Sequence, residues 1–246
     1  MARTLDTAAR GRAVVLGASM AGLLAARVLA EHFAEVVVLE RDDLSAPGDR
    51  RGVPQGRHVH ALLARGRLVL EELVPGITAD LLADGAVECR SLTEMRMTVA
   101  GHTLCQADAG YSLLQASRPF LEWRVRGRVR ALPGVELVDN TAVAGLLAGT
   151  GRARVTGVRT TDGREFDADL VVSCLGRHGP INEWLTGLGY ERPAEHGVRI
   201  DMKYASRYVR LPPRSAGGDK EIVSRTRTRP GGWPCSRWRT ARISSR

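Results

Sequence analysis

Three small residues near the N-terminus have a spacing that could bind phosphate. Gly17, Ser19 and Gly22 form the pattern G-x-S-x-x-G directly after the apolar run Ala13–Leu16. The first glycine allows a tight turn, and the last lets a helix pack close to a strand. A helix that begins at this point would direct unpaired backbone N–H groups and its positive dipole end toward a diphosphate.

An acidic residue follows at the distance that a dinucleotide site requires. Glu40 lies 18 residues beyond Gly22, at the end of the second apolar run Val36–Leu39. A carboxylate there can accept hydrogen bonds from ribose hydroxyls. This favours a ribose without a 2′-phosphate, and therefore FAD or NAD rather than NADP, although Arg41 beside it keeps NADP open.

The pattern has an alternative, because Ser19 stands where the usual motif has a second glycine. An ordinary strand–helix–strand unit with small residues at its turn would look similar and bind nothing. The strand, the helix and the acid all stand where a dinucleotide site needs them, and serine is small enough for phosphates to approach. We therefore predict dinucleotide binding.

The spacing of apolar residues and turn signals predicts the elements that position this set, and it indicates an α/β fold. We expect strands at 13–16 and 36–39, helices at 58–73, 79–82 and from 118 to Pro133-Gly134, short strands within 87–115, a strand at 135–138, meander strands at 142–147, 153–159 and 165–166, and a buried strand within 168–176. The alternating arginines of the third helix are expected on a solvated face.

Composition limits the partners and the location. The formal net charge is +9, and +6 of it lies in residues 221–246, which hold seven arginines and one acid. Without a nucleic-acid motif or interleaved aromatic residues, this charge does not predict nucleic-acid binding. No apolar run approaches the roughly 18 residues of a membrane span, and the first residues lack a signal-peptide pattern, so we expect a cytoplasmic protein. The scattered cysteines predict neither a disulfide framework nor a metal site.

Four stretches together resemble the FAD-dependent hydroxylase superfamily, which includes p-hydroxybenzoate hydroxylase and whose fold geranylgeranyl reductases share. They are GASMAGL (17–23), RRGVPQGRHVHALLARG (50–66), SRPFLEWRVRGRVRALPGV (117–135) and ADLVVSCLGRHGPINEWLTGLGY (168–190). The resemblance runs from about Arg12 to Pro213. It implies a Rossmann-like FAD-binding domain with an antiparallel β-meander crossover, plus an incomplete substrate-domain portion.

Position by position, the resemblance implies the parts of an FAD site. The backbone at Met20 and Ala21, with Ser19, would hold the pyrophosphate, and Glu40 the adenosine ribose. Two arginines would contact FAD phosphates or ribityl, since a guanidinium matches phosphate geometry, with a plain surface charge as the alternative for each. The candidate cofactor-binding set is Gly17, Ser19, Met20, Ala21, Gly22, Glu40, Arg41, Arg50, Arg118 and Val143, the last through its backbone toward adenine.

The sequence departs from the family in its C-terminal half. Ser173 and Leu175 replace the family's aspartate and threonine, and the later Gly-Asp motif is absent. From Arg225 onward there is no hydrophobic period, whereas a one-base shift of the reading frame, with G or C at third codon positions, would give a family-like stretch up to Ile243. We therefore expect a chain truncated by a frameshift, with a genuine arginine-rich tail as the alternative.

These features predict a division into domains. We expect a discontinuous FAD-binding domain over residues 1–85 and 118–180, and a partial substrate domain over 86–117 and 181–220. Residues 221–246 are expected to form a disordered tail.

The predicted function is that of an FAD-dependent monooxygenase, a hydroxylase or epoxidase of an aromatic or polyketide-like small molecule. NAD(P)H is the candidate electron donor, and no side chain can be assigned as a catalytic acid or base. Two alternatives stay open: a flavin-dependent reductase of the geranylgeranyl reductase type, and a non-catalytic remnant. An NAD-linked dehydrogenase is disfavoured by the arginine-led helix and the meander.

Overall fold

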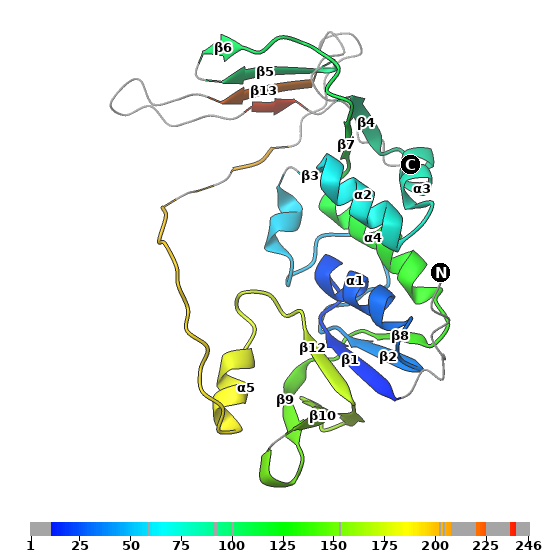
Figure 1. Ribbon diagram of the computed structural model, residues 1–246, viewed down its shortest axis with the longest axis vertical. Coiled ribbons are helices and arrows are strands. Elements are labelled where there is room, and N and C mark those ends of the chain that lie inside the picture. Colours follow the sequence, from blue (N-terminus) through cyan, green and yellow to red (C-terminus); the bar gives the residue numbers. More distant parts are fainter. Residues whose placement is uncertain are drawn as a thin grey trace, which may run out of the picture. The chain divides into compact units, whose positions relative to one another are not determined.

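The computed structural model describes residues 11–58, 60–90, 93–99, 101–152, 154–201, 203, 205–207, 220–224 and 237–239. The chain divides into two compact units (Figure 1). The first comprises Met1–Pro54 and Glu122–Met202, and the second comprises Gln55–Leu121 and Lys203–Arg246. The finer domain boundaries expected from the sequence stay a prediction.

A four-stranded parallel sheet forms the centre of the first unit. Its strand order is β12 (Leu170–Ser173), β1 (Arg12–Leu16), β2 (Glu35–Leu39) and β8 (Val135–Val138). Both N-terminal strands are fully apolar after their first residue, as strands covered on both faces require. The expected strands at 13–16, 36–39 and 135–138 and the α/β fold class are confirmed.

The two faces of this sheet are covered by different elements (Figure 1). Helix α1 (Met20–Leu29) lies over one face and buries Gly22, Leu23 and Ala26. On the other face, Val14, Leu16, Val37 and Leu39 form one buried cluster with residues of the meander. Successive residues of a strand point to opposite faces, so a single apolar run supplies both layers.

The meander is a three-stranded antiparallel sheet of β9 (Val143–Ala148), β10 (Val155–Thr160) and β11 (Glu165–Asp167). Val158 on β10 is completely buried against the parallel sheet. A short 3-10 turn (Thr150–Arg152) joins the first two strands, and helix α5 (Ile181–Gly187) follows β12. The predicted meander is therefore present.

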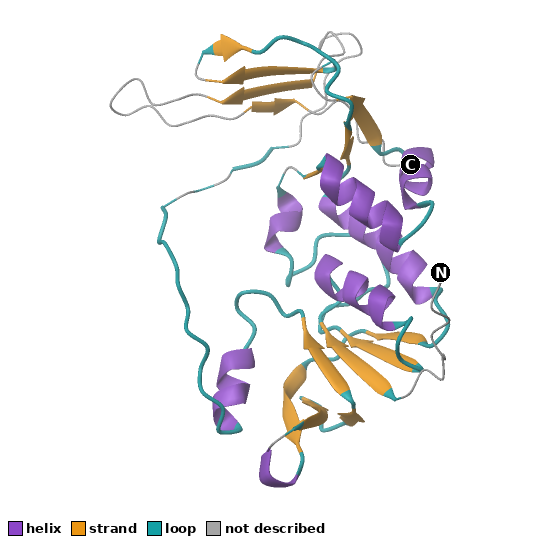
Figure 2. Ribbon diagram, viewed as in Figure 1, coloured by secondary structure: helices purple, strands orange, loops and turns teal. Residues whose placement is uncertain are grey.

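Among its described residues the second unit holds two sheets, two complete α-helices and the first turn of a third, coloured by type in Figure 2. Strands β3 (Ala61–Leu62), β7 (Ser112–Gln115) and β4 (Val87–Arg90) form an antiparallel sheet, accompanied by α2 (Ala64–Leu73) and α3 (Ile77–Ala83). The other sheet has the order β14 (Arg237–Arg239), β13 (Lys220–Ser224), β5 (Met95–Val99) and β6 (His102–Thr103). Helix α4 (Arg118–Arg130) belongs to both units, since their boundary falls after Leu121.

The strand expected to be buried within 168–176 is present as β12, but none of its four residues is buried. Two further expectations about local structure are corrected. The predicted helix at 58–73 begins only at Ala64, because Pro54–Arg57 form a 3-10 turn and Ala61–Leu62 pair with β7 instead. The arginines of α4 are not all solvated, since Arg126 is 4% exposed. Tertiary partners override the local pattern in both places.

Strands β13 and β14 fall in or beside the segment expected to be disordered. Residues 220–224 pair in parallel with β5, and residues 237–239 pair with residues 221–223. Strand β13 is stabilised by backbone pairing with β5, and the amino-acid composition of the tail does not reveal this partner. The rest of the tail lies outside the described residues, so its expected disorder and the proposed frameshift stay predictions.

Candidate cofactor site

The predicted phosphate turn lies at the carboxyl ends of β1 and β2. Gly17 has a φ of +96°, and its N–H donates to Leu39 O over 2.8 Å. A Cβ at this position would lie 2.9 Å from Cys174 O. Both the left-handed conformation and the close backbone approach therefore require glycine.

Gly22 brings helix α1 against this turn. A Cβ on Gly22 would lie 1.8 Å from Gly17 O, closer than any real contact. Any other residue would push the helix N-terminus away from the strand. Gly17 and Gly22 thus allow the close strand–turn–helix packing that the sequence predicted. Helix α1 begins at Met20, and its second residue, Ala21, is exposed.

Glu40 is 7% exposed and is bound to the loops around it. Its Oε2 accepts a hydrogen bond from Ala18 N over 2.7 Å, and its Oε1 accepts one from Asp42 N over 3.1 Å. The carboxylate therefore stands beside the phosphate turn, at the end of β2. Its predicted contact with a ribose stays a proposal.

Arg50 lies between two buried carboxylates. Its side chain is 7% exposed, its Nη1 lies 2.9 Å from Glu40 Oε2, and its Nη2 pairs with Glu122 Oε1. The same Nη2 donates to Ala18 O over 3.1 Å. Arg50 therefore connects the phosphate turn, the end of β2 and helix α4. We call Gly17, Ser19, Gly22, Glu40 and Arg50 the cradle.

The charges around Arg50 are balanced by these neighbours. Burial alone would lower the pKa of Arg50, but the carboxylates of Glu122 and Glu40 together raise it above its usual value. Burial and the nearby Arg50 lower the pKa of Arg126. Arg50 is consequently charged throughout the physiological pH range, as a phosphate-binding group must be.

The remaining predicted residues lie in different surroundings. The Arg41 side chain is 64% exposed and 4.0 Å from Asp42. Val143 begins β9 and packs against the core of the parallel sheet. Arg118 belongs to the second unit, where its Nη1 lies 3.3 Å from His60 Nε2. The structure thus brings the cradle together within one unit and places Arg118 in the other.

The sequence reading missed Glu122. This residue is the only acid on α4, beside five arginines, and it is 3% exposed. Its Oε2 accepts a hydrogen bond from Ser19 Oγ over 2.8 Å. A single acid within an arginine-rich helix, next to the apolar stripe of Leu121 and Val125, is the signal that could have identified it.

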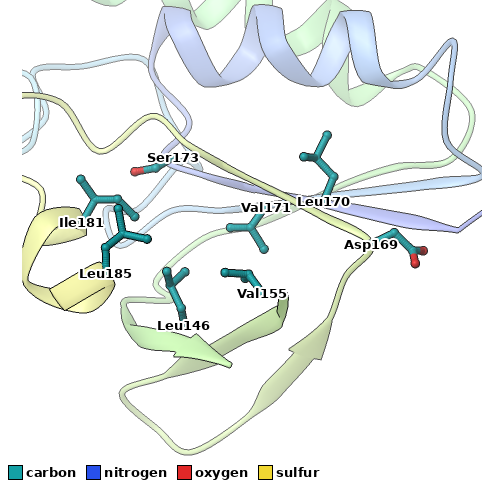
Figure 3. Close-up of a pocket in the computed structure, with 8 residues that line it drawn as sticks. All are labelled: Leu146, Val155, Asp169, Leu170, Val171, Ser173, Ile181 and Leu185. Atoms are coloured by element: carbon teal, nitrogen blue, oxygen red, sulfur yellow. The ribbon is translucent and has the colours of Figure 1, made fainter. Parts of the chain in front are cut away.

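Figure 3 shows a cavity of the first unit. It has a volume of about 220 Å³ and is lined mainly by apolar side chains of β9, β10, β12 and α5, among them Leu146, Val171 and Leu185. None of the predicted cofactor residues lines it. Within the described part of the chain there is also no group of three residues that could hold a metal ion, and no helix long and apolar enough to cross a membrane.

The cradle fits a diphosphate on three observations. Gly17 and Gly22 leave no room for a Cβ at the turn, so backbone groups line it. Helix α1 has no acidic residue in its first turn and, among the described residues, no side-chain cap. Arg50 Nη1 is buried and close to Glu40, but it is not aligned to donate a hydrogen bond to any described acceptor. A positive helix dipole, amides without a side-chain cap and a buried guanidinium charge are what a diphosphate binds.

Comparison with known proteins identifies a family that this chain matches. The model of the FAD binding domain family matches residues 11–210. Protein Rv3254 of Mycobacterium tuberculosis is 39% identical over 220 residues, which are 82% of this chain and 46% of that protein.

Solved structures share the fold. PqsL of Pseudomonas aeruginosa, described as a probable FAD-dependent monooxygenase, superposes with a TM-score of 0.58 at 18% identity, covering 86% of this chain and 53% of PqsL. The Diels-Alderase PyrE3 does so with a TM-score of 0.52 at 24% identity, covering 71% of this chain and 34% of PyrE3. The chain spans about half the length of Protein Rv3254 and PqsL. The match over residues 11–210 shows that this chain belongs to the FAD binding domain family.

Proposed function

We propose that this chain forms the FAD-binding part of an FAD-dependent monooxygenase. The observation that carries the proposal is the cradle, in which a glycine turn, an uncapped helix N-terminus and a buried arginine converge beside a carboxylate. FAD supplies the oxygen-transfer chemistry when it is bound. The chain's own residues bind and orient the cofactor.

The proposed cofactor-binding residues have distinct roles, and Gly17 and Gly22 shape the turn itself. The amides at the start of α1, at Met20 and Ala21, hold the pyrophosphate, and Glu40 accepts hydrogen bonds from the adenosine ribose. A carboxylate has about four lone-pair sites, so the two backbone amides bound to Glu40 leave capacity for a ribose hydroxyl. Arg50 adds a fixed positive charge near the phosphates, Arg118 contacts phosphate or ribityl, and Val143 faces adenine through its backbone.

The substrate is proposed to be a small organic molecule of aromatic or polyketide-like type, with NAD(P)H as the electron donor. PqsL, which shares the fold, has been solved in complex with 2-aminobenzoylacetate.

Titration of the purified chain with FAD tests the proposal. We expect saturable binding of one flavin per chain, followed by quenching of flavin fluorescence and by the visible spectrum. A protein that is purified colourless and retains no flavin after incubation with FAD and removal of the free cofactor would support the non-catalytic remnant. A spectral response to NADH without any flavin would support the dehydrogenase instead.

Two strand-end acids of β2 provide the matched control. Glu40→Ala should weaken FAD binding, because it removes the proposed ribose acceptor and a partner of Arg50. Glu35→Ala removes a carboxylate from the opposite end of the same strand, where Glu35 pairs with Arg12 at 41% exposure. Equal FAD affinity in the two variants would contradict the assignment of Glu40.

A further inference from the structure

The serine that begins helix α1 is not used as a helix cap. Ser19 has the extended backbone of an N-cap residue, with φ −85° and ψ −176°. Serine at this position normally accepts a hydrogen bond from the amide of the second or third helical residue, here Ala21 or Gly22. Among the described residues no such bond is formed, and Ser19 Oγ donates to Glu122 Oε2 over 2.8 Å.

Glu122 is held where it can take this hydroxyl. Its side chain is 4% exposed, and its second oxygen pairs with Arg50. Arg50 is in turn held by Glu40 and by Ala18 O. The carboxylate therefore has one oxygen for each of two cradle residues, and its position is fixed from both sides.

We propose that Glu122 is a positioning residue that keeps Ser19 from capping α1. The Ala21 amide, which the proposed FAD site uses, is then left for the diphosphate, with which a serine cap would compete. This inference rests on the proposed FAD function of the cradle. It also changes the role of Ser19, whose hydroxyl is directed to Glu122 rather than to a phosphate.

A double-mutant cycle separates this role from the effect of Glu122 on Arg50. The four chains are the wild type, Ser19→Ala, Glu122→Met and the double variant, and the readout is the dissociation constant of FAD. In the wild-type background Ser19→Ala should not tighten FAD binding, because the hydroxyl is already directed to Glu122 and competes for no amide. In the Glu122→Met background the same change should tighten binding about fivefold, because it removes a competing cap. Both chains that carry Glu122→Met lose the ion pair with Arg50, so this loss cancels when their FAD affinities are compared.

Glu122→Gln is a more conservative variant that can replace Glu122→Met in the cycle if the methionine variant does not fold. In Glu122→Gln the amide oxygen should face the charged Arg50, so the amide nitrogen faces Ser19 and cannot accept its hydroxyl. The rescue by Ser19→Ala should have the same sign and a smaller size. Glu31→Gln, at a 58% exposed acid that pairs with Arg27, is the charge-matched control and should give no rescue.

Amide hydrogen exchange of the FAD-free chains gives a readout that does not depend on cofactor binding. In Glu122→Met the Ala21 or Gly22 amide should exchange about fivefold more slowly than in the wild type, and the double variant should return to the wild-type rate. Unchanged exchange at both amides would overturn the positioning role. So would an equal effect of Ser19→Ala on FAD affinity in both backgrounds, which is the result that a merely structural role predicts. If the wild type binds no FAD, the proposed function fails, and the exchange rates still decide the role of Glu122.

Discussion

The cradle and the meander use the same residue types in opposite surroundings. In the cradle, Arg50 and its two carboxylate partners are between 4% and 9% exposed. In the meander, the side chains of Arg159 and Glu165 pair over 2.7 Å at 57% and 49% exposure. The distances are similar, so distance alone does not distinguish the two regions.

The difference teaches that burial, rather than pairing, decides what these charges contribute. An exposed ion pair is screened by water and typically contributes less than about 1 kcal/mol. Removing one partner of a buried pair leaves an uncompensated charge in a low-dielectric setting and is far more costly. A change at one of the buried charges of the cradle should therefore cost more stability than the same change in the exposed pair of the meander.

The largest expected effect comes from glycine substitution in the two regions. Gly22→Ala should abolish FAD binding and lower the unfolding temperature strongly, because the new Cβ would lie 1.8 Å from Gly17 O. Gly145→Ala, on meander strand β9, meets no atom within 4 Å and should leave both quantities near the wild-type values. Thermal unfolding and FAD titration of the two variants measure the contrast. Wild-type FAD affinity in Gly22→Ala would contradict the proposal that the cradle binds FAD.

The next effect comes from neutralising one acid in each region. Glu40→Gln should reduce the free energy of unfolding by about 2 to 3 kcal/mol, near the lower end of the range for a broken buried pair, because Arg50 keeps Glu122. Glu165→Gln should reduce it by less than about 0.5 kcal/mol. Urea unfolding at neutral pH gives both values. Similar losses in the two variants would show that burial does not separate the regions.

A smaller effect is expected from replacing arginine by lysine. Arg50→Lys should weaken FAD binding about tenfold, since a single ammonium group cannot replace a planar fork that contacts Glu40, Glu122 and Ala18 O together. Arg159→Lys should leave FAD affinity within about twofold of the wild type, because its pair is exposed. Isothermal titration with FAD provides the comparison, and equal affinities would argue against a specific need for a guanidinium at position 50.

The smallest effect is a pH dependence in the meander. A hydrogen bond from the Thr160 hydroxyl, aided by bonds from Arg164, lowers the pKa of Asp162 in the folded chain. Its contribution to stability is therefore present above the unfolded pKa of about 3.9 and is lost as pH falls through the lower folded value. The difference in unfolding temperature between the wild type and Asp162→Asn should shrink below about pH 4. A constant difference down to pH 2 would contradict this origin.

The local pattern of the sequence was enough for the turn and its frame. Gly17, Gly22 and Glu40 could be located because strand, turn and helix are local, and their spacing follows from the dimensions of one strand–helix–strand unit. The meander could be predicted for the same reason, since each of its strands is a short apolar run bounded by turn residues.

The interior of the cradle depends on contacts that are distant in sequence. Ser19 and Glu122 are separated by 103 positions, and Arg50 and Glu122 by 72. Glu122 and Arg126 lie at helical spacing beside the apolar stripe of Leu121 and Val125, but their charged side chains gave no sign that they are buried while Arg128 and Arg130 are exposed. Burial is a property of what packs against a helix face, and only the folded chain contains it.

The sequence by itself determined that a glycine turn would join a strand to a helix and that an acid would end the next strand. These features depend on the conformational freedom of glycine and on the two repeat lengths of secondary structure, which any short segment carries. The tertiary structure alone decided that Glu122 takes the Ser19 hydroxyl and that Arg50 lies between two carboxylates. Side chains far apart along the chain become partners only when packing removes water from between them, because in water each would be solvated separately.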